Sequence, residues 1–598
     1  MILLLALLFV PRAAQGRCQE EESCFHLDGE IRQLSVANNS VYIATEKKLY
    51  QLNHELTLVH STSQRGTMRP DKESDTRLFD RVSGSAWWND TLRINVFLPF
   101  VENKTLISCG ETSECGYCEI LDLRNISNII YHEQIQVGPL SSSSGSVAFL
   151  VTLKKTDTFI LTAIQQGYQN KEGKCRFDLE TVNLHDVDDS HGSNRGIFSL
   201  NDVTYKPLIK SEGKAEFVDG FQVGSNIYLL SNVQPSTYKN NKVRLIWFED
   251  KDSKTETLKS VRGVTLSIHD GGEGSRLLAS SIIPGEEPLL WSGVFSVDEG
   301  HTHTVLVLFD ISPDHSIMTN KDQDFYFKNL DQSPTTTKIL KPMKELLRQS
   351  YMTSVLALRH KDWRVFFIGT GDGQLIKLVV DRNFHPACPR VLYRANDDQR
   401  VFPRIHLDQV DGKHVYLPFT EQVKRVPVSQ CSTHTNVQQC WSAQDPDCVW
   451  CGPKRRSEEP HLLQSSSHTD ELTTSFSVSS CMFESDCEDG DWVSIPDVYQ
   501  QKMISHKVVA DLTGRLTLNI HIHVSTGQNR TKFTCQVSGA TGELCSRTGP
   551  PSQFPQCICL LSDITFPSDG QWFGINLGND LLEVLYITLT LALIRCHE

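Results

Sequence analysis

The chain has 598 residues, a formal net charge of −14 at pH 7 and 39% hydrophobic residues. This length predicts several domains. The acidic balance, with a pI near 5.8, argues against nucleic acid as a partner, because phosphate binding needs a basic face.

The N-terminus begins with the apolar run MILLLALLFV, and the small residues Ala14 and Gly16 follow it. This pattern predicts a signal peptide over residues 1–16, with the mature chain starting near Arg17. The alternative is a buried N-terminal strand. A secreted chain enters an oxidising compartment, where cysteines normally form disulfides.

The cysteines are distributed unevenly. Seven of the 18 lie before residue 400 and eleven after it, so we expect a large self-sufficient core first and small disulfide-stabilised modules after it. Five N-x-S/T sequons are typical of surface glycosylation in the same compartment: Asn38, Asn89, Asn103, Asn125 and Asn529.

The best candidate for a membrane span is VLYITLTLALI at 584–594. It is much shorter than the ~20 apolar residues that a bilayer requires. Its apolar and polar residues also alternate, which predicts a strand.

Residues 25–430 are rich in short β-type runs separated by turn residues, and one hairpin pattern recurs. It appears as VYIATEKKLYQL (41–52), VFFIGTGDGQLIKLVV (365–380) and VYLPFTEQVKRVPV (415–428), with less complete copies at 226–233 and 303–311. Repeated hairpins are typical of a β-propeller, here of seven blades over residues 17–430. A pair of β-sandwiches is the alternative. The stretch 341–349 is predicted to be a short helix inside an insertion.

Two smaller modules are expected after the propeller. Residues 431–492 are rich in cysteine, and residues 493–598 return to alternating strands such as RLTLNIHIHV (515–524). We predict an immunoglobulin-like sandwich there, possibly incomplete and with an atypical tail.

The cysteine-rich stretch contains Cys431, Cys440, Cys448, Cys451, Cys481 and Cys487, with Asp445 and Pro446 just before the CVWC sequence. A C-x2-C pair can bind zinc, but no second pair stands at zinc-finger spacing. It can also be a redox dithiol, but the βαβ context is missing. A disulfide knot is the favoured interpretation.

The spacing of these cysteines, with DPDCVWC, resembles the PSI domain that plexins, semaphorins and Met-type receptors share. In that family the PSI domain follows a seven-bladed sema propeller. Semaphorins typically have Asp where this chain has Cys451, whereas plexins and Met-type receptors have the C-x-W-C form. The segment FFIGTGDGQLIKLV resembles the last-but-one sema blade of plexins, and residues 543–559 resemble the first Ig-like (IPT) domain of the plexin C class.

The resemblance implies the disulfides Cys431–Cys448, Cys440–Cys481 and Cys451–Cys487. The family's second PSI cysteine falls at Val437 and its eighth is also absent, so one whole bridge is missing and no thiol is orphaned. In the sema region, Cys109–Cys118 fits the plexin pattern best. The sequence leaves open the partners of Cys18, Cys24, Cys115, Cys175, Cys388 and Cys596. The Ser-rich stretch 452–480 is predicted to be an exposed disordered loop or an error in the gene model.

Several fragments could suggest an enzyme or a metal site. Gly369–Gly373 follows a strand as a phosphate loop would, but it leads into another strand, so a hairpin turn is expected. His269 and Asp270 are read as turn residues, and the sequence around Asp250 and Asp252 lacks the remaining ligands of a calcium loop. We therefore predict a binding protein with no catalytic residue, metal or cofactor.

The resemblance implies the extracellular, ligand-binding region of a plexin C-like semaphorin receptor that acts in cell guidance, adhesion and migration. The implied partner is a class-seven GPI-linked or viral semaphorin, bound through the sema propeller. The contact residues are unknown, and blades within 145–240 are the family-based expectation. The chain would be secreted if complete, and at the plasma membrane only in a longer form. A Met-type growth-factor receptor, disfavoured because no furin site is found, and a secreted semaphorin-like ligand are the alternatives.

Overall fold

The computed structural model describes most of residues 23–452 and, beyond residue 480, mainly strands up to residue 587. Its longer gaps are 71–76, 82–88, 139–144, 165–181, 188–196, 199–212, 236–240, 269–274, 316–337, 396–399, 453–479, 494–503, 511–515, 524–532, 548–555 and 563–570. The chain divides into two compact units, 1–428 and 429–598. The first is called the propeller unit below, and the second the C-terminal unit.

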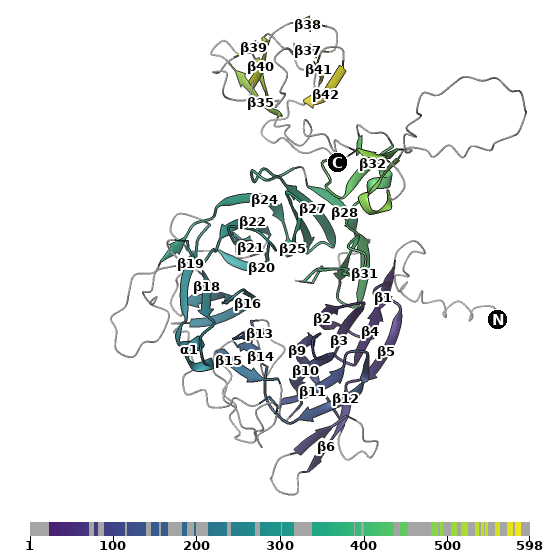
Figure 1. Ribbon diagram of the computed structural model, residues 1–598, viewed down its shortest axis with the longest axis vertical. Coiled ribbons are helices and arrows are strands. Elements are labelled where there is room, and N and C mark those ends of the chain that lie inside the picture. The colour runs from purple at the N-terminus through teal and green to yellow at the C-terminus, as the bar shows by residue number, and fades with distance from the viewer. Residues whose placement is uncertain are drawn as a thin grey trace, which may run out of the picture. The chain divides into compact units, whose positions relative to one another are not determined.

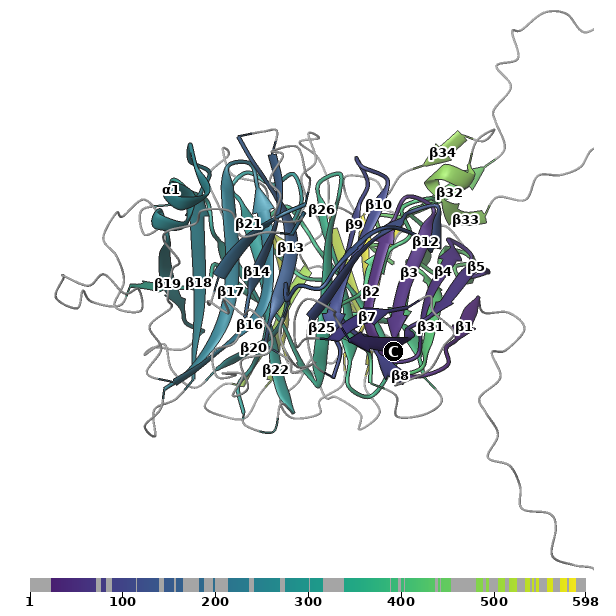
Figure 2. The same cartoon turned by 90° about the horizontal axis from the view of Figure 1, so that it is seen from below.

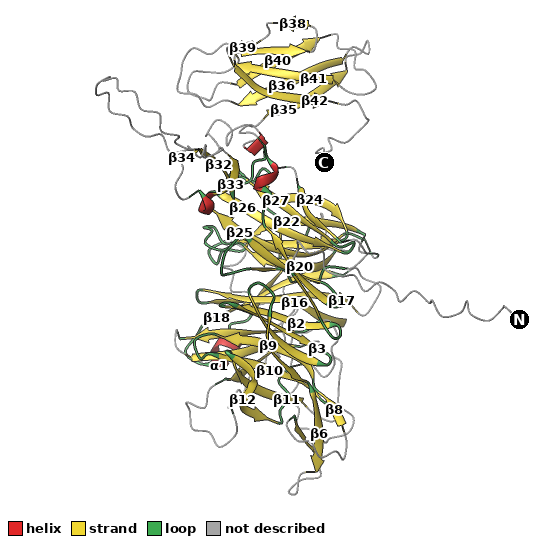
Figure 3. Ribbon diagram, turned by 90° about the vertical axis from the view of Figure 1, so that its right-hand side faces the viewer, coloured by secondary structure: helices red, strands yellow, loops and turns green. Residues whose placement is uncertain are grey.

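Strands make up almost all of the regular structure, as Figure 3 shows. The described part contains the α-helix α1 (Lys254–Lys259) and two short 3-10 helices, Cys431–Thr433 and Glu484–Asp486, and residues 439–440 are also helical. No helix in the described ranges is long and apolar enough to cross a bilayer. The predicted all-β class is confirmed.

Seven sheets of the propeller unit form a ring, which Figure 1 shows face on. Each sheet is an antiparallel meander whose first strand is innermost, and we number the sheets as blades 1 to 7. Blade 1 is β2 (Ile31–Ala37), β3 (Ser40–Thr45), β4 (Lys48–Asn53) and β5 (Leu58–Ser63). Blade 2 is β9 (Arg93–Phe100), β10 (Thr105–Glu111), β11 (Gly116–Asp122) and β12 (Asn125–Glu133). Blade 3 is β13 (Val147–Leu153), β14 (Asp157–Ala163) and β15 (Val182–Asp186).

The remaining blades follow the same plan. Blade 4 is β16 (Gly213–Val223), β17 (Asn226–Pro235), β18 (Lys242–Glu249) and β19 (Arg262–Leu266), extended in parallel by β23 (Ile339–Leu340). Blade 5 is β20 (Arg276–Ile282), β21 (Leu290–Ser296), β22 (His303–Asp310) and β24 (Lys344–Ser350). Blade 6 is β25 (Met352–His360), β26 (Trp363–Thr370), β27 (Gln374–Val380) and β28 (Arg390–Arg394). Blade 7 contains β29 (His406–Leu407), β30 (His414–Pro418) and β31 (Gln422–Pro427).

The N-terminal strand β1 (Cys24–His26) closes the ring. It pairs antiparallel with β31, so that Phe25 lies opposite Val423 and blade 7 is built from both ends of the propeller unit. Antiparallel pairing at this position covers the edge that β31 would otherwise expose. Leu27 and Ile31 then donate backbone hydrogen bonds to Glu421 and Thr420, at 2.9 and 2.8 Å, and lead the chain into blade 1.

The hydrophobic core lies between the blades. Each main cluster combines the facing sides of two neighbours, such as blades 4 and 5 around Trp291 and Phe295, or blades 7 and 1 around Tyr416 and Val41. Strand β21 shows the consequence, because all seven of its residues are buried. A blade therefore has little core without its neighbours.

The recurring hairpin of the sequence corresponds to the middle strands of the blades. Its three full copies are β3–β4, β26–β27 and β30–β31, and its incomplete copies fall on β17 and β22. The helix predicted at 341–349 is wrong, since β24 pairs there with β22 as the fourth strand of blade 5. Tertiary pairing outweighs the helical pattern of a short, locally ambiguous stretch.

A small extra sheet lies between blades 1 and 2 in the sequence, formed by β6 (Arg65–Pro70), β7 (Arg77–Asp80) and β8 (Asn89–Thr91). It is held to blade 2 by a buried ion pair, in which Arg81 lies 2.8 Å from Glu119 of β11. Burial raises the pKa of Glu119, and Arg81 opposes that effect.

The C-terminal unit contains three sheets. One is built from β32 (Cys448–Gly452), β33 (Ser480–Phe483) and β34 (Asp491–Val493). The other two are antiparallel sheets of four strands each, as expected for an immunoglobulin-like sandwich. Their strands are β35 (Ile504–Ala510), β36 (Leu516–His523), β40 (Gln556–Ser562) and β39 (Cys545–Arg547), and β38 (Ala540–Gly542), β37 (Phe533–Val537), β41 (Gln571–Leu577) and β42 (Asp580–Ile587). Strand β42 includes the start of the predicted strand at 584–594, whose remainder is outside the described residues.

We expect Trp291→Ala to lower the free energy of unfolding of the propeller unit by about 3–5 kcal/mol, because it empties the core between blades 4 and 5. Ile130→Ala on β12 is the control, since Ile130 is 55% exposed and its loss should change stability by less than about 0.5 kcal/mol. Chemical denaturation of the whole chain, followed by tryptophan fluorescence, measures both. Equal effects of the two substitutions would contradict an inter-blade core.

Candidate functional site

The innermost strands surround a cavity of about 720 Å³ on the axis of the propeller ring. Its lining comes from β2, β9, β13, β16 and β20, and from residues 400–406 that lead into β29. Six of the seven blades therefore contribute to one space. A cavity of this size is in the range of small-molecule sites.

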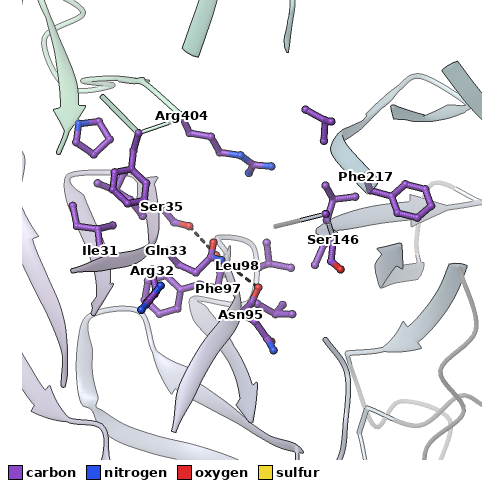
Figure 4. Close-up of a pocket in the computed structure, with 18 of the residues that line it drawn as sticks. Ile31, Arg32, Gln33, Ser35, Asn95, Phe97, Leu98, Ser146, Phe217 and Arg404 are labelled. Carbon is purple, nitrogen blue, oxygen red and sulfur yellow. Dashed lines mark hydrogen bonds between the residues drawn. The ribbon is translucent and has the colours of Figure 1, made fainter. Parts of the chain in front are cut away.

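Hydrogen bonds between blades 1 and 2 shape one wall of the axial cavity, as Figure 4 shows. Gln33 Nε2 donates to the carbonyl of Asn95 at 3.3 Å, and Ser35 Oγ donates to the carbonyl of Phe97 at 2.7 Å. These bonds join two innermost strands that share no sheet. They hold the innermost strands of blades 1 and 2 side by side in this wall of the cavity.

The charged side chains of the lining are mostly basic. Arg276 Nη2 donates to both carboxylate oxygens of Glu216, at 2.8 and 2.6 Å, in a charge-assisted pair. Arg404 lies 3.6 Å from Asp219 of β16, so it links the blade 7 side of the ring to blade 4. Figure 4 shows the Arg404 side chain extending over the cavity.

His406 is the one histidine among the residues that line the cavity. Burial, and to a smaller extent the charge of the nearby Arg404, lower its pKa to about 4. The ring is therefore neutral at physiological pH. Its Nε2 is buried and has no hydrogen-bond partner in the part of the chain that the structure describes.

The sequons gather on one face of the ring. Because a blade is a meander, its first and third turns lie at the same face, and Figure 2 shows the strands running between the two faces. Asn38 and Asn103 are exposed in the first turns of blades 1 and 2, and Asn125 follows the third turn of blade 2. Asn89 is exposed on β8, and Asn529 is outside the described residues.

The cysteine-rich module of the C-terminal unit contains three disulfides. They join Cys431 to Cys448, Cys440 to Cys481 and Cys451 to Cys487. In the propeller unit Cys109 is joined to Cys118 across β10 and β11. These are the pairs that the resemblance implied. Cys24 is also disulfide-bonded.

The core of this module is made largely of the disulfides themselves. Cys431, Cys440, Cys448 and Cys481 form one buried cluster, and Trp450 and Phe483 pack against it. Trp450 also lies opposite Cys481 in the pairing of β32 with β33. A module this small has too few apolar residues for a conventional core, so the bridges replace it. The predicted loop 452–480 lies almost wholly outside the described residues.

Asp408, Asp411 and His414 are close enough to hold a metal, and they are the one such group in the described ranges. Arg425 occupies both carboxylates, with Nε 2.9 Å from Asp408 and Nη2 bonded to Asp411. His414 Nδ1 lies 2.7 Å from Asp411. The group is an ion-pair network that joins the strands of blade 7.

The fragments that resembled enzyme motifs have structural roles. Gly371–Gly373 forms the turn between β26 and β27, as expected for a hairpin. Asp250 accepts a hydrogen bond from the backbone N–H of Lys154 at 2.9 Å. Ser253, in the same acidic stretch, caps α1 by accepting from the N–H of Glu256 at 3.1 Å. His269 and Asp270 are outside the described residues.

The region expected to contact a ligand, 145–240, consists of blade 3 and the first half of blade 4. Its described surface is small. Lys154 is exposed in the first turn of blade 3, and Gly224 and Ser225 are exposed in the first turn of blade 4. Residues 165–181 and 199–212, which lie in this region, are outside the described part.

A seven-bladed propeller, a small disulfide-rich module and two antiparallel sheets, in this order, are the sema–PSI–Ig arrangement that the sequence resemblance implied. No family model matches the chain. It is 24% identical to Plexin-C1 of Mus musculus over 507 residues and 27% identical to Plexin-C1 of Homo sapiens over 387 residues. These matches cover 79% and 60% of this chain, and confirm its resemblance to plexins of the C class.

Solved structures agree on the fold. The full extracellular region of plexin A4 superposes with a TM-score of 0.59 at 15% sequence identity, covering 94% of this chain and 61% of that one. The chain spans only 30% and 24% of the length of the two Plexin-C1 sequences that it matches.

Sequence reasoning missed the axial cavity altogether. Its lining residues are spread from Ile31 to Pro418 and share no motif. The only available signal was the repeat itself, because a ring of blades always places one strand of each repeat at the axis. No feature of the sequence alone identifies which side chains meet there.

Peptide mapping of the unreduced protein should recover Cys431–Cys448, Cys440–Cys481 and Cys451–Cys487 as separate linked pairs. The double variant Cys440→Ser/Cys481→Ser should lower the stability of the module by about 2–5 kcal/mol, because a closed loop is lost from a domain with little other core. The control is Cys109→Ser/Cys118→Ser, whose effect should be confined to the propeller unit. A peptide linking Cys448 to Cys451 would contradict this assignment.

Glu111, the last residue of β10, should make stability depend on pH. It is 7% exposed, and burial raises its pKa to about 7, while Arg93 at 3.9 Å opposes the rise. The folded state therefore holds a proton that the unfolded state releases above pH ~4.5, so stability falls as pH rises from about 4.5 to about 7. Glu111→Gln should remove up to about 3 kcal/mol of this dependence, measured as denaturation midpoints between pH 4.5 and 8. An unchanged pH profile would show that Glu111 does not titrate in that window.

Proposed function

We propose that this chain is the ligand-binding extracellular region of a plexin C-like semaphorin receptor. The observation that carries the proposal is the order of three modules, propeller, CVWC-containing disulfide module and immunoglobulin-like sandwich, together with the similarity to two Plexin-C1 sequences. The proposed domain limits are 17–430, 431–492 and 493–598. The proposed location is outside the cell, at the plasma membrane when the chain is part of a longer receptor.

The chain acts by binding and not by catalysis in this proposal. The residues that resembled catalytic or metal motifs, and that the structure describes, are engaged in turns, a helix cap and an ion-pair network. A closed ring of blades with its core between neighbours is rigid, so its turns and edges can carry recognition residues without loss of the fold.

The proposed ligand is a class-seven GPI-linked or viral semaphorin, bound by the propeller through blades 3 and 4. Two observations support this part of the ring. Glycans at Asn103 and Asn125 would cover one face of blade 2, and the Asn38 glycan would cover the same face of blade 1. Blades 3 to 7 carry no sequon, so glycans leave the edge of blades 3 and 4 open to a partner, as they also leave blades 5 to 7.

A binding panel tests the receptor proposal. The glycosylated chain should bind a class-seven semaphorin in surface plasmon resonance and should bind semaphorins of other classes at least tenfold more weakly. Hepatocyte-growth-factor-like ligands are the control for a Met-type receptor. Binding to those ligands alone, or to a plexin but to no semaphorin, would replace the proposal with one of the two alternatives.

Added glycans locate the contact. Lys154→Asn creates the sequon Asn-Lys-Thr in the first turn of blade 3, where Lys154 already has the positive φ of 51° that asparagine tolerates. Lys242→Thr completes a sequon at Asn240, which lies between β17 and β18 in the sequence. We expect at least one of these glycans to reduce semaphorin binding more than tenfold.

Two matched variants control for the substitutions. Lys154→Asn/Thr156→Ala makes the same change without the glycan and should bind normally. His385→Thr completes a sequon at Asn383 on blade 6, far around the ring, and should also leave binding intact. If the blade 6 glycan blocks binding while both test glycans are tolerated, the proposed contact region is wrong.

A further inference from the structure

The axial cavity carries a basic surface that the proposed receptor function does not use. Among its lining residues are four arginines, Arg32, Arg276, Arg400 and Arg404, against one acidic residue, Glu216. The whole chain has a net charge of −14. Basic side chains therefore outnumber acidic ones in the lining of a chain that is acidic as a whole, and a concave wall focuses the field of unpaired charges.

Three of these arginines are ion-paired, and Arg400 has no ion-pair partner among the described residues. Arg276 Nη2 is bonded to both carboxylate oxygens of Glu216, and Arg32 is bonded to Glu46 with Glu30 at 3.5 Å. Arg404 has only Asp219 at 3.6 Å, and its side chain is 58% exposed. Arg400 is exposed and has no ion-pair partner among the residues that the structure describes. The surplus charge therefore belongs to the segment 400–406.

Backbone contacts fix this segment in place. Val401 donates to the carbonyl of Thr370 at 3.2 Å and accepts from Thr353 Oγ1 at 3.1 Å, while Phe402 donates to the carbonyl of Pro418 at 2.9 Å. Val401 and Ile405 are buried, whereas Arg400 and Arg404, each the residue before one of them, are exposed. The backbone that carries the two arginine side chains is therefore held in place by buried neighbours and hydrogen bonds.

Gly369 makes this arrangement possible. A Cβ at residue 369 would lie 2.6 Å from Cγ1 of Val401, closer than side chains approach one another. The glycine therefore lets the 400–406 segment lie directly on β26. Gly369 is the first glycine of the motif that resembled a phosphate loop. In the structure, its missing side chain leaves room for the 400–406 segment.

A second, independent observation concerns His406. This residue lines the same cavity, and its Nε2 is buried without a hydrogen-bond partner in the described ranges. Most buried polar atoms in proteins are hydrogen-bonded, so an oxygen atom of a bound group or a water is a fitting partner for it. A neutral imidazole can donate one N–H to an oxygen atom there.

We propose that the axial cavity binds a small molecule bearing a sulfate or phosphate group, held by Arg400 and Arg404 with His406 as a hydrogen-bond donor. Arginine suits this role because its planar fork matches two oxygens of a tetrahedral oxyanion. The cavity volume of about 720 Å³ accommodates a ligand of two or three sugar rings. Two kinds of ligand have this chemistry, a sulfated saccharide and an organic phosphate, since both carry a tetrahedral oxyanion on a polar molecule.

Isothermal titration calorimetry of the glycosylated whole chain tests the site with four probes. These are a sulfated heparin disaccharide, the same disaccharide without sulfate, inositol hexakisphosphate and sodium sulfate. We expect one of the two organic anions to bind at least tenfold more tightly than sodium sulfate, and the desulfated disaccharide not to bind. The preferred anion identifies the kind of ligand. Absence of binding by both organic anions at 50 mM salt overturns the proposal.

Substitutions assign the binding to the cavity. Arg400→Gln/Arg404→Gln should weaken the preferred probe at least tenfold, and Arg400→Gln alone should weaken it several-fold. Arg65→Gln/Arg382→Gln removes the same charge from two exposed arginines outside the lining and should leave affinity unchanged. Melting temperatures verify that each variant is folded. Arg400 has no ion-pair partner in the described structure, so Arg400→Gln leaves no carboxylate unpaired. This single variant should therefore fold and can test the site even if the double variant is unstable.

His406→Gln separates a specific site from general attraction to arginine. Glutamine retains an N–H donor but not the imidazole. The affinity for the preferred anion should therefore fall less than in the double arginine variant. The difference in affinity between the preferred anion and the other probes should become smaller. Equal binding by the control pair and by the Arg400/Arg404 variant would show that the anion binds to scattered surface charge, which overturns the proposal. Semaphorin binding by all of these variants is expected to be unchanged, because the proposed contact lies on blades 3 and 4.

Discussion

The packing between neighbouring blades is the interaction on which the rest of the structure depends. Each of the main apolar clusters of the propeller unit is shared by two blades, so no blade can bury its faces alone. The last cluster, between blades 7 and 1, can form only when the ring closes. Closure requires β1, three residues near the N-terminus, to pair with β31 some 400 residues later in the chain.

Ring closure also produces the axial cavity and the two faces of the propeller unit. Because every blade begins at the axis, the innermost strands surround a cavity, and because the blades are meanders, their turns are sorted onto two faces. The sequons at Asn38, Asn103 and Asn125 thereby come together on one face, although 87 residues separate the first from the last. The proposed partner surface on blades 3 and 4 and the proposed anion site at the axis are separate parts of one ring.

The cysteine-rich module of the C-terminal unit is stabilised by disulfides and not by an apolar core. This module has too few apolar residues to bury a core, and three disulfides take that role, with Trp450 packed against them. Covalent closure of loops lowers the entropy of the unfolded chain, which compensates for the missing apolar area. The propeller unit relies instead on apolar packing, and has Cys109–Cys118 within a single hairpin.

Local patterns in the sequence determined much of this protein. The repeated hairpins predicted the propeller and fall on real strand pairs, and the strand expected at 515–524 is β36. The turn at Gly371–Gly373 followed from the strands on both sides of it, because turn chemistry is local. Where local preference was ambiguous, as at 341–349, the sequence favoured a helix and pairing with β22 made a strand. The tertiary structure alone decided what meets at the axis. Arg32, Glu216 and Arg404 come from blades far apart in the sequence, and their meeting depends on ring closure, which no short pattern encodes.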